Sequence, residues 1–314
     1  MNYINAQQIR QLISMRECIE VMKDLFILDQ ENDLINPLRT HMKIPNGAVM
    51  GMMPAYIKPY QAMGIKIICI YRQNKQKGLS SHSGIVHLFD AENGLLKLSL
   101  DADEVTALRT AGVSALMTDL LAIDKAQTLA LIGSGTQAES HLEAILEIRP
   151  IKKVKIWSPT LANVETFIKK QKLKFNIEFE SCKSPELAVH DADIICTLTA
   201  ASEPLLENSW LKENVHINVV GASTPRAREL SSEIILNADV YVDNFESACK
   251  ESGDLLLSFG NPENILVQIK GDIHQALMNK NSIDKNRTTV FKSLGLGIED
   301  VAIAHYCFEK KSKI

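Results

Sequence analysis

The chain has 314 residues, 46% of them hydrophobic, which is enough to bury a sizeable core and is typical of two domains. Its formal net charge of −4 and the lack of a basic block exclude the usual signature of a nucleic-acid-binding or membrane-surface protein. No signal peptide opens the chain, and no apolar run reaches membrane-spanning length. The six cysteines are scattered and the eight histidines form no ligand cluster, so we expect a cytoplasmic protein with reduced thiols and no metal site.

The N-terminal third is expected to mix helix and sheet. Apolar residues that recur on one face predict a helix over residues 5–30. From residue 39 to residue 100 the pattern becomes that of β-strands. Three strands are expected in this part: residues 64–71, 83–89 and 95–100, the last two forming a hairpin whose turn contains Asn93-Gly94. A long helix over residues 103–122 follows, with Asp101 or Asp103 as its N-terminal cap.

The most informative stretch lies at residues 129–138, where an apolar run ends in a glycine-rich turn. The buried strand is followed by Gly133-Ser134-Gly135-Thr136-Gln137-Ala138, a G-x-G-x-x-A motif. In this motif the first glycine allows a sharp turn, the second lets a pyrophosphate approach the main chain, and the small third residue allows close helix–strand packing. A helical pattern begins at once, so its free amides would face the phosphates. The alternative interpretation is a glycine-rich turn without a dinucleotide.

Strands alternate with helical stretches in the rest of the chain. Six strands are expected: residues 129–132, 154–157, 176–180, 194–198, 216–220 and 240–242. Alternating strands and helices predict an α/β fold with a Rossmann-type, doubly wound parallel sheet over residues 121–289. Residues 288–308 read as a strand followed by a helix. We expect residues 1–120 and 290–314 to form a second, discontinuous α+β domain.

Three basic residues of this second domain stand in sequence contexts that are unusual for a charge. Arg39 follows Asn-Pro-Leu, Lys66 lies inside an apolar strand, and Arg109 lies among small residues of a helix. A buried lysine is costly unless it meets an anion or loses its proton. Together the three cations could hold a small carboxylate, and Lys66 could also exchange a proton. For each residue alone, a structural ion pair is the alternative.

Six stretches, taken in order, resemble the ornithine cyclodeaminase and mu-crystallin family over nearly the whole chain. They are MPAY at 53–56, TALRTAGVSA at 106–115, IGSGTQA at 132–138, VGAS at 220–223, ACKESGD at 248–254 and FKSLG at 291–295. The resemblance implies a homodimer, a substrate-binding and dimerisation domain, and NAD(P)-linked chemistry at the C–N bond of a small amino or imino acid. It also implies that Arg39, Lys66 and Arg109 bind the substrate carboxylate. Lys66 and Arg109 would be catalytic, with Lys66 the proton donor or acceptor.

Residue 223 separates two branches of that family. Cyclodeaminases that convert ornithine to proline resemble this chain up to Val220-Gly221, but they carry an aspartate where this chain has Ser223. A hydroxyl cannot offset a buried ammonium as a carboxylate does. Ser223, which we expect to contact the substrate, therefore resembles the ketimine-reductase-like mu-crystallin branch. The alternative is that Glu229 or Asp254 supplies the missing carboxylate.

The second strand of the dinucleotide domain leaves the choice of cofactor open. It ends in Trp157-Ser158-Pro159-Thr160, with neither the acid typical of NAD sites nor the arginine typical of NADP sites. Ser158, Thr160 and the amides of the next helix could hold a 2′-phosphate, which favours NADP slightly over NAD. The residues expected to bind the cofactor are Thr110, Gly133, Gly135, Thr136, Gln137, Ala138, Ser158, Thr160, Thr197 and Gly221.

We therefore expect an oxidoreductase that uses NAD(P)H to reduce a ketimine or imino acid, or that runs in reverse as an amino-acid dehydrogenase such as alanine dehydrogenase. One alternative is an ornithine cyclodeaminase, a lyase that uses bound NAD without net redox change. Another is a non-catalytic protein of the mu-crystallin type that binds NADP or a small molecule. Two further polar residues are interpreted as structural: Asp300 as a favourable charge near a helix N-terminus and His82 as a solvated loop residue.

Overall fold

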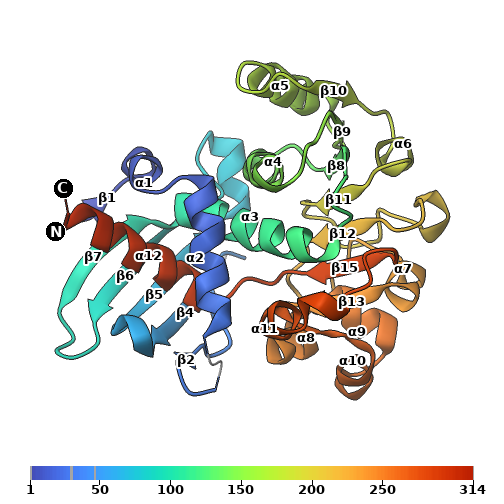
Figure 1. Ribbon diagram of the computed structural model, residues 1–314. Helices are drawn as coiled ribbons and strands as arrows, with labels where there is room; N and C mark the ends of the chain where they lie inside the picture. The colour runs from blue at the N-terminus through green and yellow to red at the C-terminus, as the bar shows by residue number, and fades with distance from the viewer. Residues whose placement is uncertain (1, 29–30, 46, 314) are drawn as a thin grey trace. The chain divides into compact units, whose positions relative to one another are not determined.

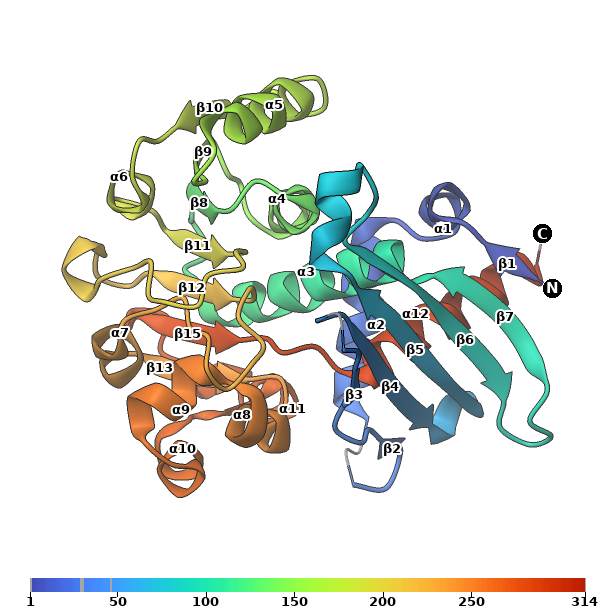
Figure 2. The ribbon, with the colours of Figure 1, turned by 180° about the vertical axis from the view of Figure 1, so that it is seen from behind.

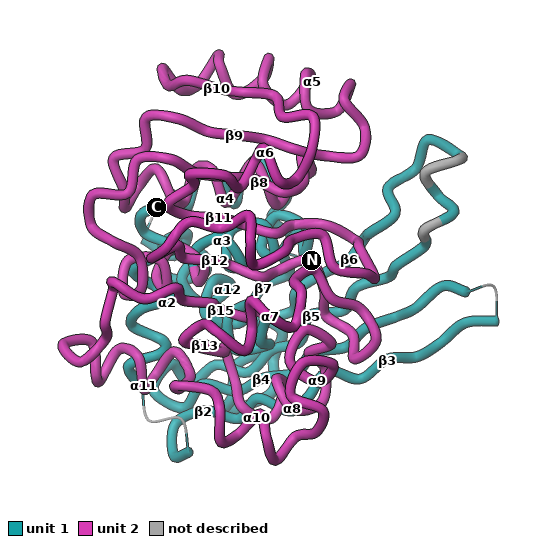
Figure 3. The backbone as a smooth tube through the Cα atoms, turned by 90° about the vertical axis from the view of Figure 1, so that its right-hand side faces the viewer, with its two compact units in different colours: residues 1–112, 295–314 teal, residues 113–294 magenta. Residues whose placement is uncertain are grey.

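The computed structural model describes residues 2–28, 31–45 and 47–313. The chain divides into two compact units (Figure 3). Unit 1 consists of residues 1–112 and 295–314, and unit 2 of residues 113–294. Helix α3 (Ala102–Leu121) contains the first of these boundaries. No helix in the described part of the chain is both long and apolar enough to cross a membrane.

Unit 1 is built on a seven-stranded mixed sheet in the order β1-β7-β6-β5-β4-β2, with β3 paired to β4. The strands are β1 (Tyr3–Ile4), β2 (Leu34–Ile35), β3 (Thr40–Lys43), β4 (Val49–Ile57), β5 (Ala62–Ile70), β6 (His82–Asp90) and β7 (Leu96–Asp101). Two 3-10 segments, Lys58–Tyr60 and Arg72–Lys77, follow β4 and β5. Strands β6 and β7 are antiparallel neighbours, which confirms the predicted hairpin.

Helix α12 (Gly297–Lys311) lies across one face of this sheet, and α2 (Met15–Ile27) packs on α12 (Figures 1 and 2). The alternation of β5 explains which side chains the helix covers. Gly64 faces it, because a Cβ there would lie 2.8 Å from Val301 Cγ2. Lys66, two residues on, shares this buried face, whereas Ile65 between them points to the other side and is only partly buried. The period of the strand therefore carries Lys66 beneath α12.

The single N-terminal helix expected over residues 5–30 is wrong. The structure has two helices, α1 (Ala6–Leu12) and α2, and residues 29 and 30 lie outside the described part. Ser14 begins α2 with a capping box, in which its Oγ accepts from the amide of Glu17 at 3.2 Å and the Glu17 carboxylate accepts from the amide of Ser14 at 2.9 Å. These reciprocal bonds satisfy amides that a continuous helix would bond to its own carbonyls.

Unit 2 contains an eight-stranded parallel sheet in the order β10-β9-β8-β11-β12-β15-β13-β14. The strands are β8 (Thr128–Ile132), β9 (Lys153–Trp157), β10 (Glu178–Ser181), β11 (Ile194–Thr197), β12 (His216–Val219), β13 (Asp239–Val242), β14 (Gly271–Asp272) and β15 (Thr289–Lys292). The central strands β11, β12 and β15 are buried along their whole length, as expected of a parallel sheet covered on both faces. The predicted doubly wound sheet is confirmed.

Strand β15 corrects one expectation. Residues 290–314 were expected in the N-terminal domain, but β15 pairs with both β12 and β13 in the parallel sheet. The chain leaves this sheet only after Lys292 and enters unit 1 at Gly295.

The helices of unit 2 connect the parallel strands. They are α4 (Thr136–Ile148), α5 (Leu161–Lys172), α6 (Pro185–Val189), α7 (Ser232–Asn237), α8 (Phe245–Glu251), α9 (Gly253–Phe259), α10 (Pro262–Gln268) and α11 (Ile273–Met278), with 3-10 segments at Asn208–Trp210 and Lys280–Ser282. Helices α4 and α6 lie on opposite faces of the sheet (Figures 1 and 2). The carboxyl ends of the strands therefore meet along one edge, where such folds bind ligands.

Candidate active site

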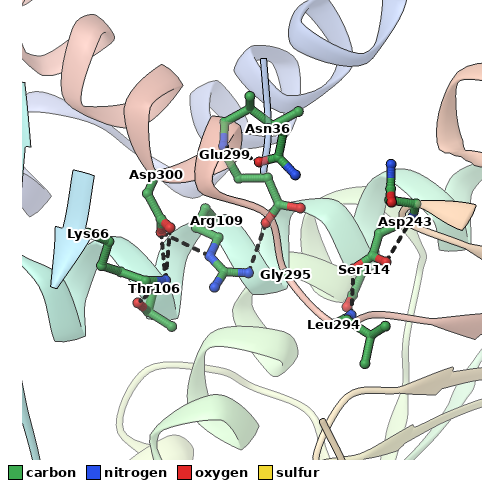
Figure 4. Close-up of polar contacts among 12 residues, drawn as sticks. Asn36, Lys66, Thr106, Arg109, Ser114, Asp243, Leu294, Gly295, Glu299 and Asp300 are labelled. Atoms are coloured by element: carbon green, nitrogen blue, oxygen red, sulfur yellow. Dashed lines mark hydrogen bonds and ion pairs between the residues drawn. The ribbon is translucent and has the colours of Figure 1, made fainter. Parts of the chain in front are cut away.

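Lys66 of β5 is buried in unit 1 and bound to a carboxylate that the sequence analysis did not assign to it. Its side chain is 3% exposed, and that of Asp300 is fully buried. Lys66 Nζ lies 3.0 Å from Asp300 Oδ1 and 2.8 Å from Oδ2, and 3.3 Å from Thr106 Oγ1 (Figure 4). Among the described residues this ammonium bonds only to side chains, so a ligand can compete for it without breaking main-chain hydrogen bonds.

Arg109 of α3 joins the same cluster. Its Nη1 donates to Glu299 Oε2 at 2.8 Å, and its Nε donates to Asp300 Oδ1 at 3.2 Å (Figure 4). Gly295 makes room for this guanidinium, because a Cβ at that residue would lie 2.2 Å from Arg109 Nη1. Gly295 also has φ +80°, a backbone conformation that residues other than glycine rarely adopt. The glycine between β15 and α12 therefore fixes where Arg109 lies.

Arg39, the third expected cation, reaches the same segment. It is half-buried, and its Nη2 donates to the carbonyl of Gly295 at 3.0 Å. Close by in sequence, Asn36 Oδ1 accepts from the amide of Ile298 at 3.1 Å and so caps the start of α12. The three cations named from the sequence thus all bond to residues 295–300 of unit 1.

Two carboxylates were missed as members of this cluster. Asp300 was interpreted as a charge near a helix N-terminus; it does lie in the first turn of α12, but it also bridges Lys66 and Arg109. Glu299, fully buried, binds Arg109 and was not singled out at all. The only sequence signal was the adjacent Glu-Asp pair after a glycine-rich turn, which does not identify partners about 200 residues away (|i−j| 234 for Lys66–Asp300 and 190 for Arg109–Glu299).

The electrostatics of the cluster suit proton exchange. Burial lowers the pKa of Lys66 to about 8, Arg109 acts in the same direction, and Asp300 opposes both. A lysine with a pKa near neutrality can give or take a proton under physiological conditions. An arginine presents its donors in a fixed planar fork that matches a carboxylate.

The glycine-rich turn in unit 2 has the geometry that dinucleotide binding needs. Gly133 has φ +125°, and a Cβ there would lie 2.7 Å from the carbonyl oxygen of Leu198. At Gly135, by contrast, a Cβ would meet no atom within 4 Å, so the main chain is open to a ligand. Ala138 is fully buried, and Gln137 Oε1 has no hydrogen-bond partner among the described residues. The turn and the exposed start of α4 at Thr136 therefore fit a pyrophosphate.

The ends of β9 and β10 form the region expected near the 2′ position of the cofactor. Ser158 is half-buried, and Thr160 is exposed and makes no capping bond to α5. Lys183, which no sequence motif marks, is exposed and lies shortly after β10. Cys182, between the end of β10 and Lys183, donates its amide to the carbonyl of Ile156 at 2.8 Å. The pairing brings this lysine to the carboxyl ends of β9 and β10.

Two expected cofactor residues differ in what they offer a ligand. Thr197 is fully buried, and its hydroxyl donates to Glu229 Oε2 at 2.9 Å, so this donor is engaged within the protein, and a contact between Thr197 and the cofactor stays a prediction. Thr110 of α3 is 5% exposed, and its Oγ1 has no hydrogen-bond partner in the part of the chain that the structure describes. A buried hydroxyl in that state fits a site for a polar ligand.

The two carboxylates considered as substitutes for the cyclodeaminase aspartate lie in the interior of unit 2. Glu229 and Asp254 are both fully buried and accept hydrogen bonds from the main chain of unit 2. Ser223, after the carboxyl end of β12, is half-buried. Gly221 beside it packs closely, because a Cβ there would lie 2.1 Å from the carbonyl oxygen of Thr199. His82 is exposed, as expected of a solvated residue, but it is the first residue of β6 and not part of a loop.

Known proteins are similar to this chain over most or all of its length. The model of the "Ornithine cyclodeaminase/mu-crystallin family" matches residues 2–313. Ketimine reductase mu-crystallin of Mus musculus is 36% identical over 283 residues, which covers 90% of this chain and 87% of that protein. The structure of Thermococcus litoralis Delta(1)-pyrroline-2-carboxylate reductase in complex with NADH and L-proline has a TM-score of 0.94 at 30% identity and covers 100% of this chain and 98% of that one. An archaeal alanine dehydrogenase dimer with bound NAD has a TM-score of 0.91 at 24% identity, covers 100% of this chain and 96% of that one, and supports the fold alone.

These matches confirm the resemblance predicted from the six motifs and the expected α/β fold with its parallel sheet. At the level of the family, they also confirm the prediction of an NAD(P)-dependent enzyme of imino and amino acids. The chain belongs to the ornithine cyclodeaminase/mu-crystallin family.

Proposed function

We propose that this protein uses NAD(P)H to reduce the C=N bond of a small cyclic imino acid to the corresponding cyclic amino acid. The observation that carries the proposal is the buried cluster of Lys66, Arg109 and Asp300, in which Lys66 has a pKa of about 8. The similarity to a ketimine reductase and to a Delta(1)-pyrroline-2-carboxylate reductase supports the same class of substrate. In the reverse direction, the same site would oxidise an α-amino acid.

The residues of unit 1 would divide the work of catalysis. Arg39 and Arg109 bind the substrate carboxylate. Arg109 donates to Glu299 and Asp300 with two of the five N–H groups of its guanidinium, so other donors remain for the substrate. Lys66 gives its proton to the imine nitrogen, and Asp300 holds the ammonium in place. The reduced dinucleotide, when bound, supplies a hydride to the imine carbon. One proton and one hydride thus convert the C=N bond to a C–N bond.

The substrate is proposed to lack a distal ammonium. Ser223 replaces the carboxylate that would meet such a group, and Glu229 and Asp254 are committed to the main chain. A ring imine with one carboxylate needs only the cations of unit 1. This argument favours the reductase over the ornithine cyclodeaminase.

Assays with purified protein test the proposal. We expect NADPH or NADH to be consumed with five- and six-membered cyclic imino acids that carry a carboxylate, and no ammonia to be released from ornithine with catalytic NAD. Ammonia release would support the cyclodeaminase. Tight dinucleotide binding without turnover of any imine would support the non-catalytic binder.

The dinucleotide is proposed to bind at the glycine-rich turn. Gly135→Val should abolish binding, because the branched side chain occupies the place of the pyrophosphate. Its melting temperature should stay near that of the wild type, because a Cβ at Gly135 meets nothing within 4 Å. Unchanged affinity for both NADPH and NADH in a fluorescence titration would place the cofactor elsewhere.

Between the two cofactors, we propose a preference for NADP. Ser158, Thr160 and Lys183 offer hydroxyls and a cation, and no carboxylate lies between Trp157 and Thr160. Lys183→Ala should lower the affinity for NADPH and leave the affinity for NADH unchanged. Lys172→Ala, at the far end of α5, should change neither affinity. If Lys183→Ala lowered the affinity for both cofactors equally, Lys183 would not act on the 2′-phosphate.

A homodimer is proposed to form through the face of the unit 1 sheet opposite α12. That face is apolar and only partly buried, and it borders a cavity of about 450 Å³ lined in part by Pro54, Tyr56, Met63, Ile65 and Phe89. Large exposed apolar patches mark interaction surfaces. Met63→Glu should shift the protein to monomers in sedimentation velocity; a wild-type protein that is monomeric at all concentrations would contradict the proposal.

A further inference from the structure

Three of the six family stretches also contribute to a second set of buried charges, apart from Lys66, Arg109 and Asp300. They are residues 220–223, 248–254 and 291–295. In unit 2 they converge on one buried charge network around Glu229, Asp254 and Lys292, all of which are fully buried. The network lies at the carboxyl ends of β11, β12 and β15, since Thr197, Val219 and Lys292 are the last residues of those strands.

Glu229 is the centre of this network. Its Oε1 accepts from the amide and the hydroxyl of Thr199, at 2.9 and 2.7 Å. Its Oε2 accepts from the amides of Gly221 and Ala222, at 2.8 and 3.2 Å, and from the hydroxyl of Thr197 at 2.9 Å. One carboxylate therefore ties the turn after β11 to the turn after β12.

Asp254 and Lys292 hold Glu229 in place from the other side. Asp254 Oδ1 accepts from the amides of Glu229 and Leu230, at 2.8 and 3.1 Å. Lys292 Nζ lies 3.2 Å from Asp254 Oδ2 and donates to the carbonyls of Val219, at 3.3 Å, and Ala222. Burial raises the pKa of Glu229, and the charge of Lys292 opposes this shift, so the lysine helps to keep the carboxylate ionised.

We propose that Glu229 is a positioning residue for the dinucleotide: by accepting the amides of Thr199, Gly221 and Ala222 it sets the two turns at the carboxyl edge of the sheet in the conformation that binds the cofactor. This inference rests on the proposed dinucleotide site. It also gives Thr197 an indirect role, because Thr197 acts on the ligand through Glu229.

The glycines of these turns support the inference. A Cβ at Gly221 would lie 2.6 Å from Glu229 Oε1 as well as against Thr199, so the turn closes tightly around the carboxylate. A Cβ at Gly253 would lie 2.1 Å from the carbonyl oxygen of Ala227, which presses the segment that leads to Glu229 against the start of α9. The main chain is closely packed here, so a change at Glu229 should shift both turns.

The charge of Glu229 is needed as well as its shape. A glutamine has one oxygen and one NH2 group in place of the two oxygens. In one orientation its NH2 group faces the amide of Thr199, and in the other it faces the amides of Gly221 and Ala222. Either orientation leaves at least one partly or fully buried amide without its acceptor.

The test compares two buried hydrogen-bonding sites of the same unit. Glu229→Gln alters the carboxyl edge of the sheet. The matched control, Thr289→Val, alters the amino end of β15, where Thr289 Oγ1 lies 2.9 Å from His216 Nδ1. Dissociation constants for NADPH and NADH would be measured by fluorescence titration, with the melting temperature of each variant recorded alongside. Asp254→Asn keeps an oxygen for the two amides and removes only the ion pair, so it separates charge pairing from main-chain positioning.

We expect Glu229→Gln to raise the dissociation constant of the better-bound dinucleotide about tenfold or more, the scale of one buried amide left without an acceptor. Thr289→Val should lower the melting temperature and leave the dissociation constant unchanged, and Asp254→Asn should give an intermediate rise. If Glu229→Gln does not fold, Thr197→Val, which removes one donor to the carboxylate, should raise the dissociation constant about threefold. A folded Glu229→Gln, or failing that Thr197→Val, with wild-type affinity would overturn the inference. Wild-type protein that binds neither dinucleotide would overturn the proposed function itself.

Discussion

In unit 1 the buried charges of Lys66, Arg109 and Asp300 bond to one another, whereas in unit 2 those of Glu229, Asp254 and Lys292 bond largely to the main chain. Both sets are almost completely removed from water. The first set can rearrange its side chains around a ligand without disturbing any strand or helix. The second set cannot, because each of its members holds main-chain amides or carbonyls.

This difference distinguishes buried charges that can take part in a reaction from buried charges that stabilise the main chain. A buried charge that is paired only with other side chains keeps a perturbed pKa and donors that a substrate can use, as Lys66 does. A buried charge that satisfies several main-chain groups gains the hydrogen bonds that offset its desolvation, and it fixes the backbone in return. The same substitution, lysine to methionine, is therefore expected to lower turnover at Lys66 and to lower stability at Lys292.

The largest effect on stability is expected for Lys292→Met. Asp254, which remains fully buried, would lose the one cation that pairs with it among the described residues, so the free energy of unfolding should fall by about 3–5 kcal/mol. Chemical denaturation measures the change. The control is Lys155→Met, a buried lysine of the same sheet that donates to the carbonyl of His190 and leaves no carboxylate behind. If the two variants lost the same free energy of unfolding, the ion pair of Lys292 and Asp254 would contribute no more to stability than the hydrogen bond of Lys155.

The largest effect on turnover is expected for Lys66→Met. Removal of a general acid should lower kcat by about a hundredfold or more, while Asp300 keeps its contact with Arg109 and the fold is retained. Dinucleotide affinity should be unchanged. Lys97→Met, a lysine of the same sheet paired with Asp90, should keep wild-type kcat. A Lys66→Met variant with near-normal kcat and a raised KM would make this lysine a carboxylate anchor and no proton donor.

A smaller, pH-dependent effect is expected for Asp300→Asn. Asp300 raises the pKa of Lys66, so its removal should lower that pKa below the present value of about 8. As a proton donor, Lys66 is active below its pKa and inactive above it. The alkaline fall of kcat/KM should therefore move to lower pH by about one unit. An unmoved limb would show that Asp300 does not act on the titrating group.

The sequence predicted the parts of the molecule whose signals are local. The turn at Gly133–Ala138 was recognised because a glycine pattern, a strand and a helix follow one another without a gap, and the conformation of Gly133 agrees. Lys66 was noticed because a charge within an apolar strand contradicts its surroundings. The break before α2 also had a local signal, the Ser14 and Glu17 capping box, which the apolar periodicity concealed.

The partners of these residues could not be predicted in the same way. Glu299 and Asp300 meet Arg109 and Lys66 across about 200 residues of chain (|i−j| 190 and 234), and nothing in a Glu-Asp pair states what it binds. Likewise, Glu229 serves main-chain amides, which every residue has, so no residue type marks its role. Strand β15 was assigned to the wrong sheet because a short apolar run does not identify its neighbours.

The proposed role of Lys66 is tested most directly by the pH dependence of kcat/KM for a cyclic imino acid at saturating NAD(P)H, in the wild type and in Lys66→Met. The account predicts that the wild-type value falls above about pH 8, where Lys66 loses its proton. It also predicts that the Lys66→Met variant shows a low residual rate without that fall. A wild-type enzyme that reduces the imine, together with a Lys66→Met variant that keeps both the rate and the alkaline fall, would contradict the account.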